Sequence, residues 1–259
     1  MEIAKKGIFV PWDFTEKTAV AIEHAVMISK TMDKSIVLLH IVKNSKMIAD
    51  VEPKMKESAN SINEKYNIEV GYLVEVGNII KTISKVAQDK DASIIIMGME
   101  GGRTARKVIA GSKVPFLLIQ SLPKNNKIQE IVVPIDTDEK NRVQMNWVTY
   151  LSKYFNSNIN IIKPYIEKNS KNILMKKNMQ FARMVLDAKN VVYGIKTSKR
   201  DEKFDHAVNK FAKEIDADMI FIMSYNLKKL FKWMEKEEMK IPIICINPAT
   251  DLKVLPDKR

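Results

Sequence analysis

The sequence has little that supports covalent crosslinking, metal binding or membrane insertion. It contains one cysteine and three histidines, so neither a disulfide framework nor a cysteine-rich metal cluster is expected. No apolar run approaches the roughly 20 residues that a membrane-spanning helix needs. The first residues, MEIAKKGIFVPWD, lack the longer apolar segment and cleavage site of a signal peptide. These absences predict a protein of the reducing cytoplasm with no membrane partner, in which Cys245 packs as an apolar side chain.

Negative charge is also in short supply. The chain has 43 Lys+Arg against 31 Asp+Glu, a net charge of +12, and most of the excess lies in residues 124–259. A basic balance invites a nucleic-acid interpretation, but the lysines are scattered and no glycine-aromatic RNA motif or zinc-finger spacing accompanies them. The charge therefore favours a solvated surface over a nucleic-acid site.

What the sequence does contain is a long internal repeat. The stretch VPWDFTEKTAVAIEHA, at 10–25, returns 123 positions later as VPIDTDEKNRVQMNWV. DASIIIMG at 91–98 corresponds to DADMIFIM at 216–223, and VPFLLIQ at 114–120 corresponds to IPIICIN at 241–247. A period this long indicates a duplicated domain rather than a solenoid. We expect domains at 1–122 and 128–259, joined by the polar linker SLPKNNKIQ at 121–129.

Each copy alternates apolar runs of strand length with segments of helical periodicity. The strands expected in the first copy are 7–13, 35–42, 69–77, 92–98 and 116–120, with helices from Thr15 (a candidate N-cap) and at 46–66, 79–88 and 103–110. In the second copy the expected strands are 131–136, 159–164, 191–197, 219–224 and 243–247, and the expected helices are 139–155, 171–187, 205–215 and 230–240. This alternation predicts an α/β fold with two tandem, doubly wound, parallel five-stranded sheets.

The order of these segments resembles the universal stress protein family. The resemblance rests on the stretches FVPWDFTEKTAVAIEHAVMISKTMDKSIVLLHIV, IIIMG and VPFLLIQ. It covers nearly all of residues 3–120 and extends more faintly over 129–248. It implies a Rossmann-like fold of the adenine-nucleotide-hydrolase type and a role in stress response. Since family members commonly pair through their last strands, it also implies that 114–120 and 241–247 lie side by side as an intramolecular pseudo-dimer. A homodimer of whole chains and an unidentified protein partner stay open.

Many members of that family bind ATP through a Gly-x2-Gly-x9-Gly-[Ser/Thr] signature, in which glycines let backbone N–H groups surround phosphates. Gly98, Gly101, Gly111 and Ser112 have this spacing. In the family, however, the final Gly-Ser opens the last helix, whereas here Pro115 stands only three positions after Ser112. Because one helical turn takes about 3.6 residues, no helix fits between them.

Aligning backward from Pro115 gives a different assignment. The last helix becomes 103–110, with Val108 and Ile109 buried, Arg106 and Lys107 facing solvent or a neighbouring chain, and Gly111 ending the helix at a positive φ. Roughly nine residues of the phosphate loop are then absent, about the length of the spacer in the signature. The second copy is short at the same place and has no glycine there, so its phosphate site is expected to be lost.

Candidate nucleotide- or anion-binding residues remain in the first domain, at the carboxyl ends of strands where such sheets bind ligands. They are Pro11, Asp13, Ile41, Gly98, Gly101, Gly102, Arg103 and Thr104. The alternative is that Asp13 caps the following helix and the glycines only form a tight bend; Asp136 of the second copy has the same two interpretations. The histidines pair with no serine or cysteine at a recognised catalytic spacing. We therefore expect no catalytic residues and no metal.

Two functions stay in view. The first is a non-enzymatic stress-response or regulatory protein that needs no cofactor, with its ATP phosphate loop shortened in domain 1 and lost in domain 2. The alternative is an adenine-nucleotide-binding protein, slowly hydrolysing ATP or holding AMP, that uses domain 1 only. The missing loop residues favour the first function.

Overall fold

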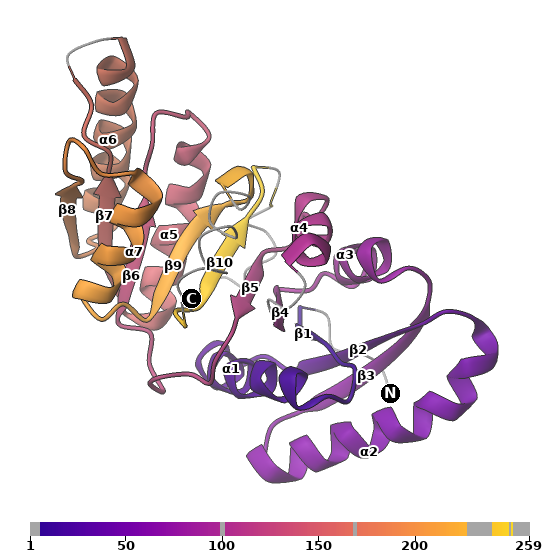
Figure 1. Cartoon of the computed structure of the whole chain (residues 1–259). Coiled ribbons are helices and arrows are strands. Elements are labelled where there is room, and N and C mark those ends of the chain that lie inside the picture. The colour runs from indigo at the N-terminus through magenta and orange to yellow at the C-terminus, as the bar shows by residue number, and fades with distance from the viewer. Residues whose placement is uncertain (1–5, 99–101, 168–169, 227–239, 249, 251–259) are drawn as a thin grey trace. The chain divides into compact units, whose positions relative to one another are not determined.

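The computed structural model describes residues 6–98, 102–167, 170–226, 240–248 and 250. It divides into two compact units, one formed by residues 1–123 with 245–259 and the other by residues 124–244 (Figure 1). The change from the first unit to the second therefore falls inside the polar segment predicted as the linker. Within the described ranges, no helix is both long and apolar enough to cross a membrane.

The first unit is a parallel sheet with helices on both faces. Its elements are β1 (Ile8–Pro11), α1 (Glu16–Met32), β2 (Ile36–Val42), the 3-10 turn η1 (Ser45–Met47), α2 (Ile48–Tyr66), β3 (Val70–Val76), α3 (Ile79–Asp89), β4 (Ile94–Gly98), α4 (Gly102–Ala110) and β5 (Phe116–Ile119). The strands pair in parallel in the order β3-β2-β1-β4-β5. Figure 1 shows α1 and α2 on one face and α3 and α4 on the other. This confirms the predicted doubly wound fold.

Burial on both faces explains the continuous apolar runs of the central strands. Ile8, Phe9 and Val10 of β1 are fully buried, as are Ile95 and Ile96 of β4. A strand covered by helices on each side cannot alternate polar and apolar residues, because both sets of side chains enter the core. The burial of these strands is the main apolar contribution to the stability of the unit.

The second unit repeats this arrangement. Its elements are β6 (Glu130–Pro134), α5 (Asn141–Phe155), β7 (Asn158–Lys163), α6 (Ser170–Ala188), β8 (Tyr193–Thr197), α7 (Phe204–Glu214), β9 (Met219–Met223), the 3-10 turn η2 (Ser224–Asn226) and the start of β10 (Ile243–Ile246), whose last two residues are counted with the first unit. The strand order β10-β9-β6-β7-β8 matches that of the first unit, and β6 pairs in parallel with β7 and β9. The predicted duplication is thus confirmed as a duplicated topology. The helix predicted at 230–240 lies outside the described residues except at its last position.

The helix before β5 follows the alignment made backward from Pro115. α4 ends at Ala110, and Val108 and Ile109 are 1% and 0% exposed, as predicted. Lys107 is exposed as predicted, whereas Arg106 is half-buried rather than facing solvent. Ser112 lies beyond the C-terminal end of this helix and is buried, with its hydroxyl donating to the Val114 carbonyl at 2.9 Å.

One expectation about this helix end is wrong: Gly111 does not adopt a positive φ. Side chains satisfy the last carbonyls of α4 instead. The Ser84 hydroxyl donates to the Val108 carbonyl at 2.8 Å, and the buried Asn247 amide donates to the carbonyls of Ile109 and Ser112, both at 2.6 Å. Because these donors complete the helix end, no left-handed glycine is needed there.

We therefore predict that Gly111→Ala leaves stability unchanged or raises the free energy of unfolding by about 0.4–1 kcal/mol, because alanine restricts the unfolded chain. A Cβ at position 111 has no atom within 4 Å, so it meets no obstacle. Gly77→Ala is the matched contrast, since its Cβ would clash with the Thr82 hydroxyl, and it should destabilise. Urea unfolding of both variants measures the difference. A loss of 1 kcal/mol or more for Gly111→Ala would contradict this account of the helix end.

A buried histidine connects α1 to the end of the first sheet. His24 is 1% exposed, and its Nε2–H donates to the Ser121 carbonyl at 2.8 Å. Its other nitrogen, Nδ1, is buried and has no hydrogen-bond partner among the described residues. Burial lowers the pKa of His24, against smaller opposing effects of the Ser121 hydrogen bond and the Glu23 charge. Protonation would place an unpaired N–H in the core, so the folded state favours the neutral ring.

The lowered pKa of His24 predicts a pH-dependent stability. The unfolded chain takes up the His24 proton near pH 6.5 and the folded chain only at lower pH, so this contribution is present above pH 6.5 and is lost as the pH falls toward the folded pKa. We expect the free energy of unfolding, measured in urea at pH 7.5, 6.5 and 5.5, to decline over this range. His24→Gln keeps a donor for Ser121 but cannot titrate, so it should flatten the decline. An equally steep decline in the variant would assign it to other groups.

Candidate functional site

A cavity lies at the carboxyl ends of the central strands of the first unit. Its volume is about 660 Å³. It is bounded by the ends of β1, β2 and β4 and by the first turns of α1 and α3, with the lining residues Pro11, Trp12, Asp13, Thr15, Glu16, Thr18, Leu39, His40, Ile41, Ile79, Ile83, Met97 and Gly98. β1 lies between β2 and β4, so the connections diverge at this point and leave a crevice, which is where open α/β sheets bind ligands.

The structure brings four of the eight candidate residues together in this cavity: Pro11, Asp13, Ile41 and Gly98. Gly102, Arg103 and Thr104 form the first turn of α4, which begins four positions after Gly98. Gly101 lies outside the described residues. Gly111 and Ser112, the last two residues of the apparent signature, instead follow the last turn of α4.

Asp13 already serves the N-terminus of α1. One carboxylate oxygen, Oδ1, accepts from the Thr15 backbone N–H at 3.0 Å, the Thr15 hydroxyl at 2.6 Å and the Thr18 hydroxyl at 3.0 Å. Thr15 occupies the N-cap position without capping the helix through its own side chain, and Asp13 holds Thr15 and Thr18 in place at the start of α1. Burial alone would raise the pKa of the Asp13 carboxyl, but these hydrogen bonds together outweigh it and lower the pKa.

The rings of Trp12, Phe14 and His40 lie near one another beside the cavity. The Trp12 N–H donates to the Leu39 carbonyl at 2.9 Å, and the His40 ring donates through Nδ1 to the Trp12 carbonyl at 2.6 Å. The Phe14 ring lies 5.1 Å from the His40 ring, centroid to centroid, and 6.4 Å from the Trp12 ring. Phe14 also has φ 66°, a left-handed conformation that is rare for an aromatic residue. Such an outlier beside a cavity is typical of functional sites.

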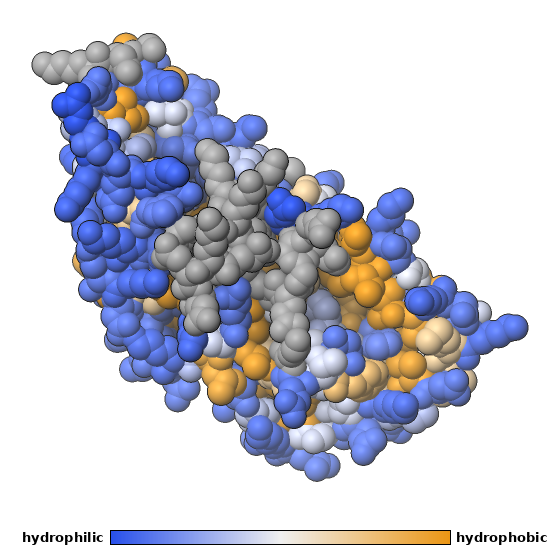
Figure 2. All heavy atoms as spheres, viewed as in Figure 1, coloured by the Kyte–Doolittle hydropathy of each residue, from blue (hydrophilic) through white to orange (hydrophobic). Residues whose placement is uncertain are grey.

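The helix α3 supplies a wall that the sequence analysis did not assign to the site. Ile79, in the first turn of α3, and Ile83, one turn later, both line the cavity. The Asn78 side chain fixes the start of α3 by accepting from the Ile80 N–H at 3.0 Å. Ile79 is 53% exposed. Its position, two residues after the strand predicted at 69–77 and therefore near the carboxyl edge of the sheet, was the signal in the sequence. Figure 2 shows apolar residues gathered on the part of the first unit that contains α3.

The charge of the described lining is negative. It contains the carboxylates of Asp13 and Glu16 and no lysine or arginine among the described lining residues. Most of the remaining lining is apolar, including Ile41, Ile83 and Met97. A lining of this kind suits an uncharged ring system with hydroxyl groups better than a polyanion, because carboxylates repel phosphates at short range.

The second unit has a cavity at its own strand ends, with a different lining. Its volume is about 710 Å³, and it is lined by Pro134, Asp136, Thr137, Asp138, Lys203, Phe204, Asp205, Val208, Ile222 and Asn226. Oδ1 of Asp136 accepts from the Asp138 N–H at 2.8 Å and from the Asn141 amide at 2.5 Å, so this carboxylate also organises a turn. Among the residues described, no group of three His, Cys, Asp or Glu side chains is placed to hold a metal ion.

Comparison with known proteins agrees with this architecture. Residues 6–120 match the universal stress protein family model. A universal stress protein of Methanocaldococcus jannaschii is 24% identical over 141 residues, which is 43% of this chain and 87% of that protein. Among solved structures, a universal stress protein from Archaeoglobus fulgidus superposes with a TM-score of 0.71 at 16% identity, over 93% of this chain and 96% of that one. A Pseudomonas aeruginosa structure superposes with a TM-score of 0.66 at 13% identity, over 97% and 95% of the two chains.

These findings define the class of the protein. It is an α/β protein whose Rossmann-like fold occurs twice in one chain. Over residues 6–120, its first domain is similar to the universal stress protein family. The second domain shares the fold of that family, as the superposition over nearly the whole chain shows.

The hydrogen bonds of Asp13 predict the effect of its removal. Asp13→Ala should lower the free energy of unfolding by about 1 kcal/mol, the usual cost of losing a helix cap, because three donors at the start of α1 lose their acceptor. Since the pKa of Asp13 is lowered, the stabilisation is present above pH 3.8 and lost as the pH falls below that value. Urea unfolding of the wild type and the variant at pH 7 and at pH 3 measures the loss of stability and its dependence on pH. A variant as stable as the wild type at pH 7 would contradict the capping role.

Proposed function

We propose that this protein is a non-enzymatic stress-response or regulatory module whose first domain binds the nucleoside part of an adenine nucleotide. The observation that carries the proposal is the lining of the first cavity. It joins aromatic and apolar groups with the carboxylates of Asp13 and Glu16, and its described residues include no lysine or arginine. The ligand class that fits is adenosine or AMP rather than a triphosphate.

The course of the chain after β4 supports a phosphate-poor ligand. Only three residues separate Gly98, the end of β4, from Gly102, the start of α4. Ser112 is buried beyond the other end of α4, where its hydroxyl serves the backbone of Val114. These positions support a shortened phosphate loop, because Gly111 and Ser112 follow the last turn of α4 instead of opening a helix.

The contacts of the polar groups support a role without catalysis. His40 uses one ring nitrogen to hold the Trp12 carbonyl, and Asp13 uses one carboxylate oxygen to hold the start of α1. These hydrogen bonds give both groups a structural role in shaping the cavity. The second domain is proposed to bind no ATP, since the sequence between Met223 and Pro242 contains no glycine with which to surround phosphates.

Further parts of the proposal come from the family resemblance. A cytoplasmic location and pairing of the two domains within one chain, through residues 114–120 and 241–247, stay predictions. So do a homodimer of whole chains and an unidentified protein partner.

Calorimetric titration with adenosine, AMP and ATP, with and without Mg²⁺, tests the function. We expect adenosine and AMP to bind and ATP to bind more weakly, because its added phosphates meet Asp13 and Glu16. Gly98→Leu should weaken adenosine binding at least about tenfold, or ~1.4 kcal/mol, by filling the cavity. Among the residues that the structure describes, none has an atom within 4 Å of a Cβ built at Gly98, so the fold should tolerate the change.

Gly111→Ala is the control, because its Cβ is equally unhindered and position 111 lies outside the cavity. It should bind adenosine like the wild type. Tighter binding of Mg²⁺-ATP than of AMP would overturn the proposal and favour the ATP-binding alternative. Loss of binding in Gly111→Ala, with the protein still folded, would make Gly111 a phosphate-loop residue.

A further inference from the structure

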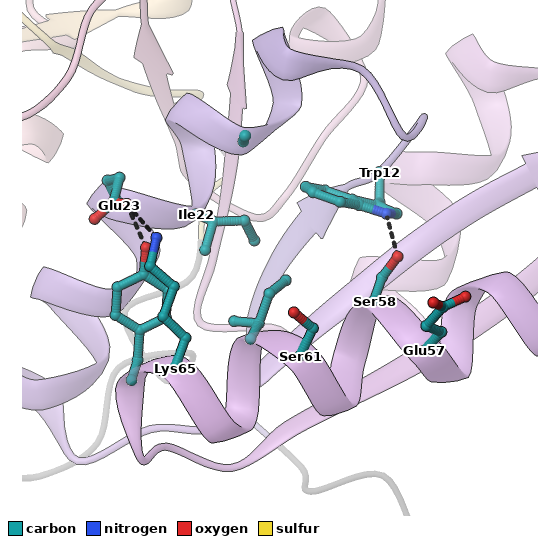
Figure 3. A pocket seen from close by; sticks show the side chains of 10 residues that line it. Trp12, Ile22, Glu23, Glu57, Ser58, Ser61 and Lys65 are labelled. Atoms are coloured by element: carbon teal, nitrogen blue, oxygen red, sulfur yellow. Dashed lines mark hydrogen bonds and ion pairs between the residues drawn. The ribbon is translucent and has the colours of Figure 1, made fainter.

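The first unit has a second concave site, a groove between α1 and α2. Figure 3 shows this groove, which has a volume of about 380 Å³. Residues of α1 form one side and residues of α2 the other, with Trp12 at the end of the groove; the lining is Trp12, Ala19, Ile22, Glu23, Glu57, Ser58, Ser61, Ile62, Lys65 and Tyr66. Apart from Trp12, these residues do not line the cavity at the strand ends. The groove is therefore a separate site.

At one end of the groove the charged side chains are paired with each other. Glu23 accepts a hydrogen bond from the Tyr66 hydroxyl and lies 3.6 Å from the Lys65 ammonium (Figure 3). The Lys65 ammonium also lies 4.6 Å from the centre of the Tyr66 ring. The positive charge of Lys65 is thus matched within the groove, and it leaves no excess of positive charge to attract an anion.

The other end carries an unmatched negative charge. The lining has two glutamates against one lysine, and Lys65 is paired with Glu23, so Glu57 is the charge in excess. In the part of the chain that the structure describes, Glu57 has no ion pair or hydrogen bond. Ser58 and Ser61 flank it on the same helix, and the Ser58 oxygen accepts from the Trp12 indole N–H at 3.3 Å. A local negative charge in a chain of net charge +12 favours a cationic ligand.

Aromatic and apolar groups complete the site. The Trp12 indole lies across the groove in Figure 3, held by its hydrogen bond to Ser58. An indole is the side chain with the strongest cation–π attraction for ammonium groups. Ile22 and Ile62 are 3% and 9% exposed, so they form a packed apolar wall between the two charged ends.

From this arrangement we infer that the groove binds a small organic ammonium compound. The ammonium group lies between the Glu57 carboxylate and the Trp12 ring, and an aryl or alkyl body lies against Ile22 and Ile62. The volume of the groove is at the lower end of the range for small-molecule sites, which limits the ligand to about the size of a single ring with a short chain.

Titration with phenethylammonium, followed by calorimetry and by amide NMR shifts, tests the inference. We expect it to bind at least about threefold more tightly than the neutral 2-phenylethanol, the increment of an exposed ion pair. The anion 3-phenylpropionate should bind more weakly still. Shifts should fall on α1 and α2. Equal binding of the three probes, or no shift on these helices, would overturn the proposal.

Three variants sharpen the test. Glu57→Gln removes the charge and keeps the shape, so phenethylammonium affinity should fall about threefold. Glu52→Gln, on the same helix but outside the lining, should change nothing. Ser61→Leu fills the groove from an exposed helical position and should abolish binding without unfolding the domain. Wild-type affinity in both Glu57→Gln and Ser61→Leu would refute the site.

Gly98→Leu separates this site from the nucleoside cavity. Gly98 lines only the cavity at the strand ends, so this variant should bind phenethylammonium like the wild type. A loss of amine binding in Gly98→Leu would place the amine in the other cavity and overturn the inference.

Discussion

The first unit is organised around β1, which is hydrogen-bonded to β2 on one side and to β4 on the other. Ile8, Phe9 and Val10 are fully buried because helices cover both faces of the sheet. This position fixes where the chain leaves β1. The ladder to β2 continues one residue beyond the strand through Trp12 and Leu39, so Trp12 and Asp13 are held at the point where the connections of the sheet diverge. Both concave sites of the first unit depend on that constraint.

Trp12 is the residue that the two sites share. Its backbone carbonyl is held by His40 on the side of the strand ends, and its indole N–H is held by Ser58 on α2. A ligand in either site therefore contacts a ring whose position is set by residues of the other. Linkage requires that any effect of one ligand on the affinity of the second be reciprocal.

The two units show that the same fold carries different chemistry. Each has a cavity at the carboxyl ends of corresponding strands, and in each an aspartate at the end of the first strand organises the following turn. The first cavity is lined mainly by aromatic and apolar groups with two carboxylates, and the second by three aspartates and a lysine beside apolar groups such as Phe204 and Ile222. Ligand preference therefore belongs to the side chains that each copy places at the same position, since the fold alone does not select a ligand.

The sequence by itself determined the duplication, the alternation of strands and helices, and the end of α4. These follow from local patterns: continuous apolar runs such as that of β1, helical periodicity, and the position of Pro115 only three residues after Ser112. Four of the proposed site residues also followed from it, because the carboxyl ends of parallel strands meet at one edge of a sheet. The sequence did not reveal that Asn247 completes the end of α4, from more than 130 positions away, and so removes the need for a left-handed Gly111. Nor did it place Ile79 and Ile83 in the cavity, or Trp12 beside Ser58. Such contacts join segments that are distant in the chain, and only the packing of helices on the sheet decides which distant side chains meet.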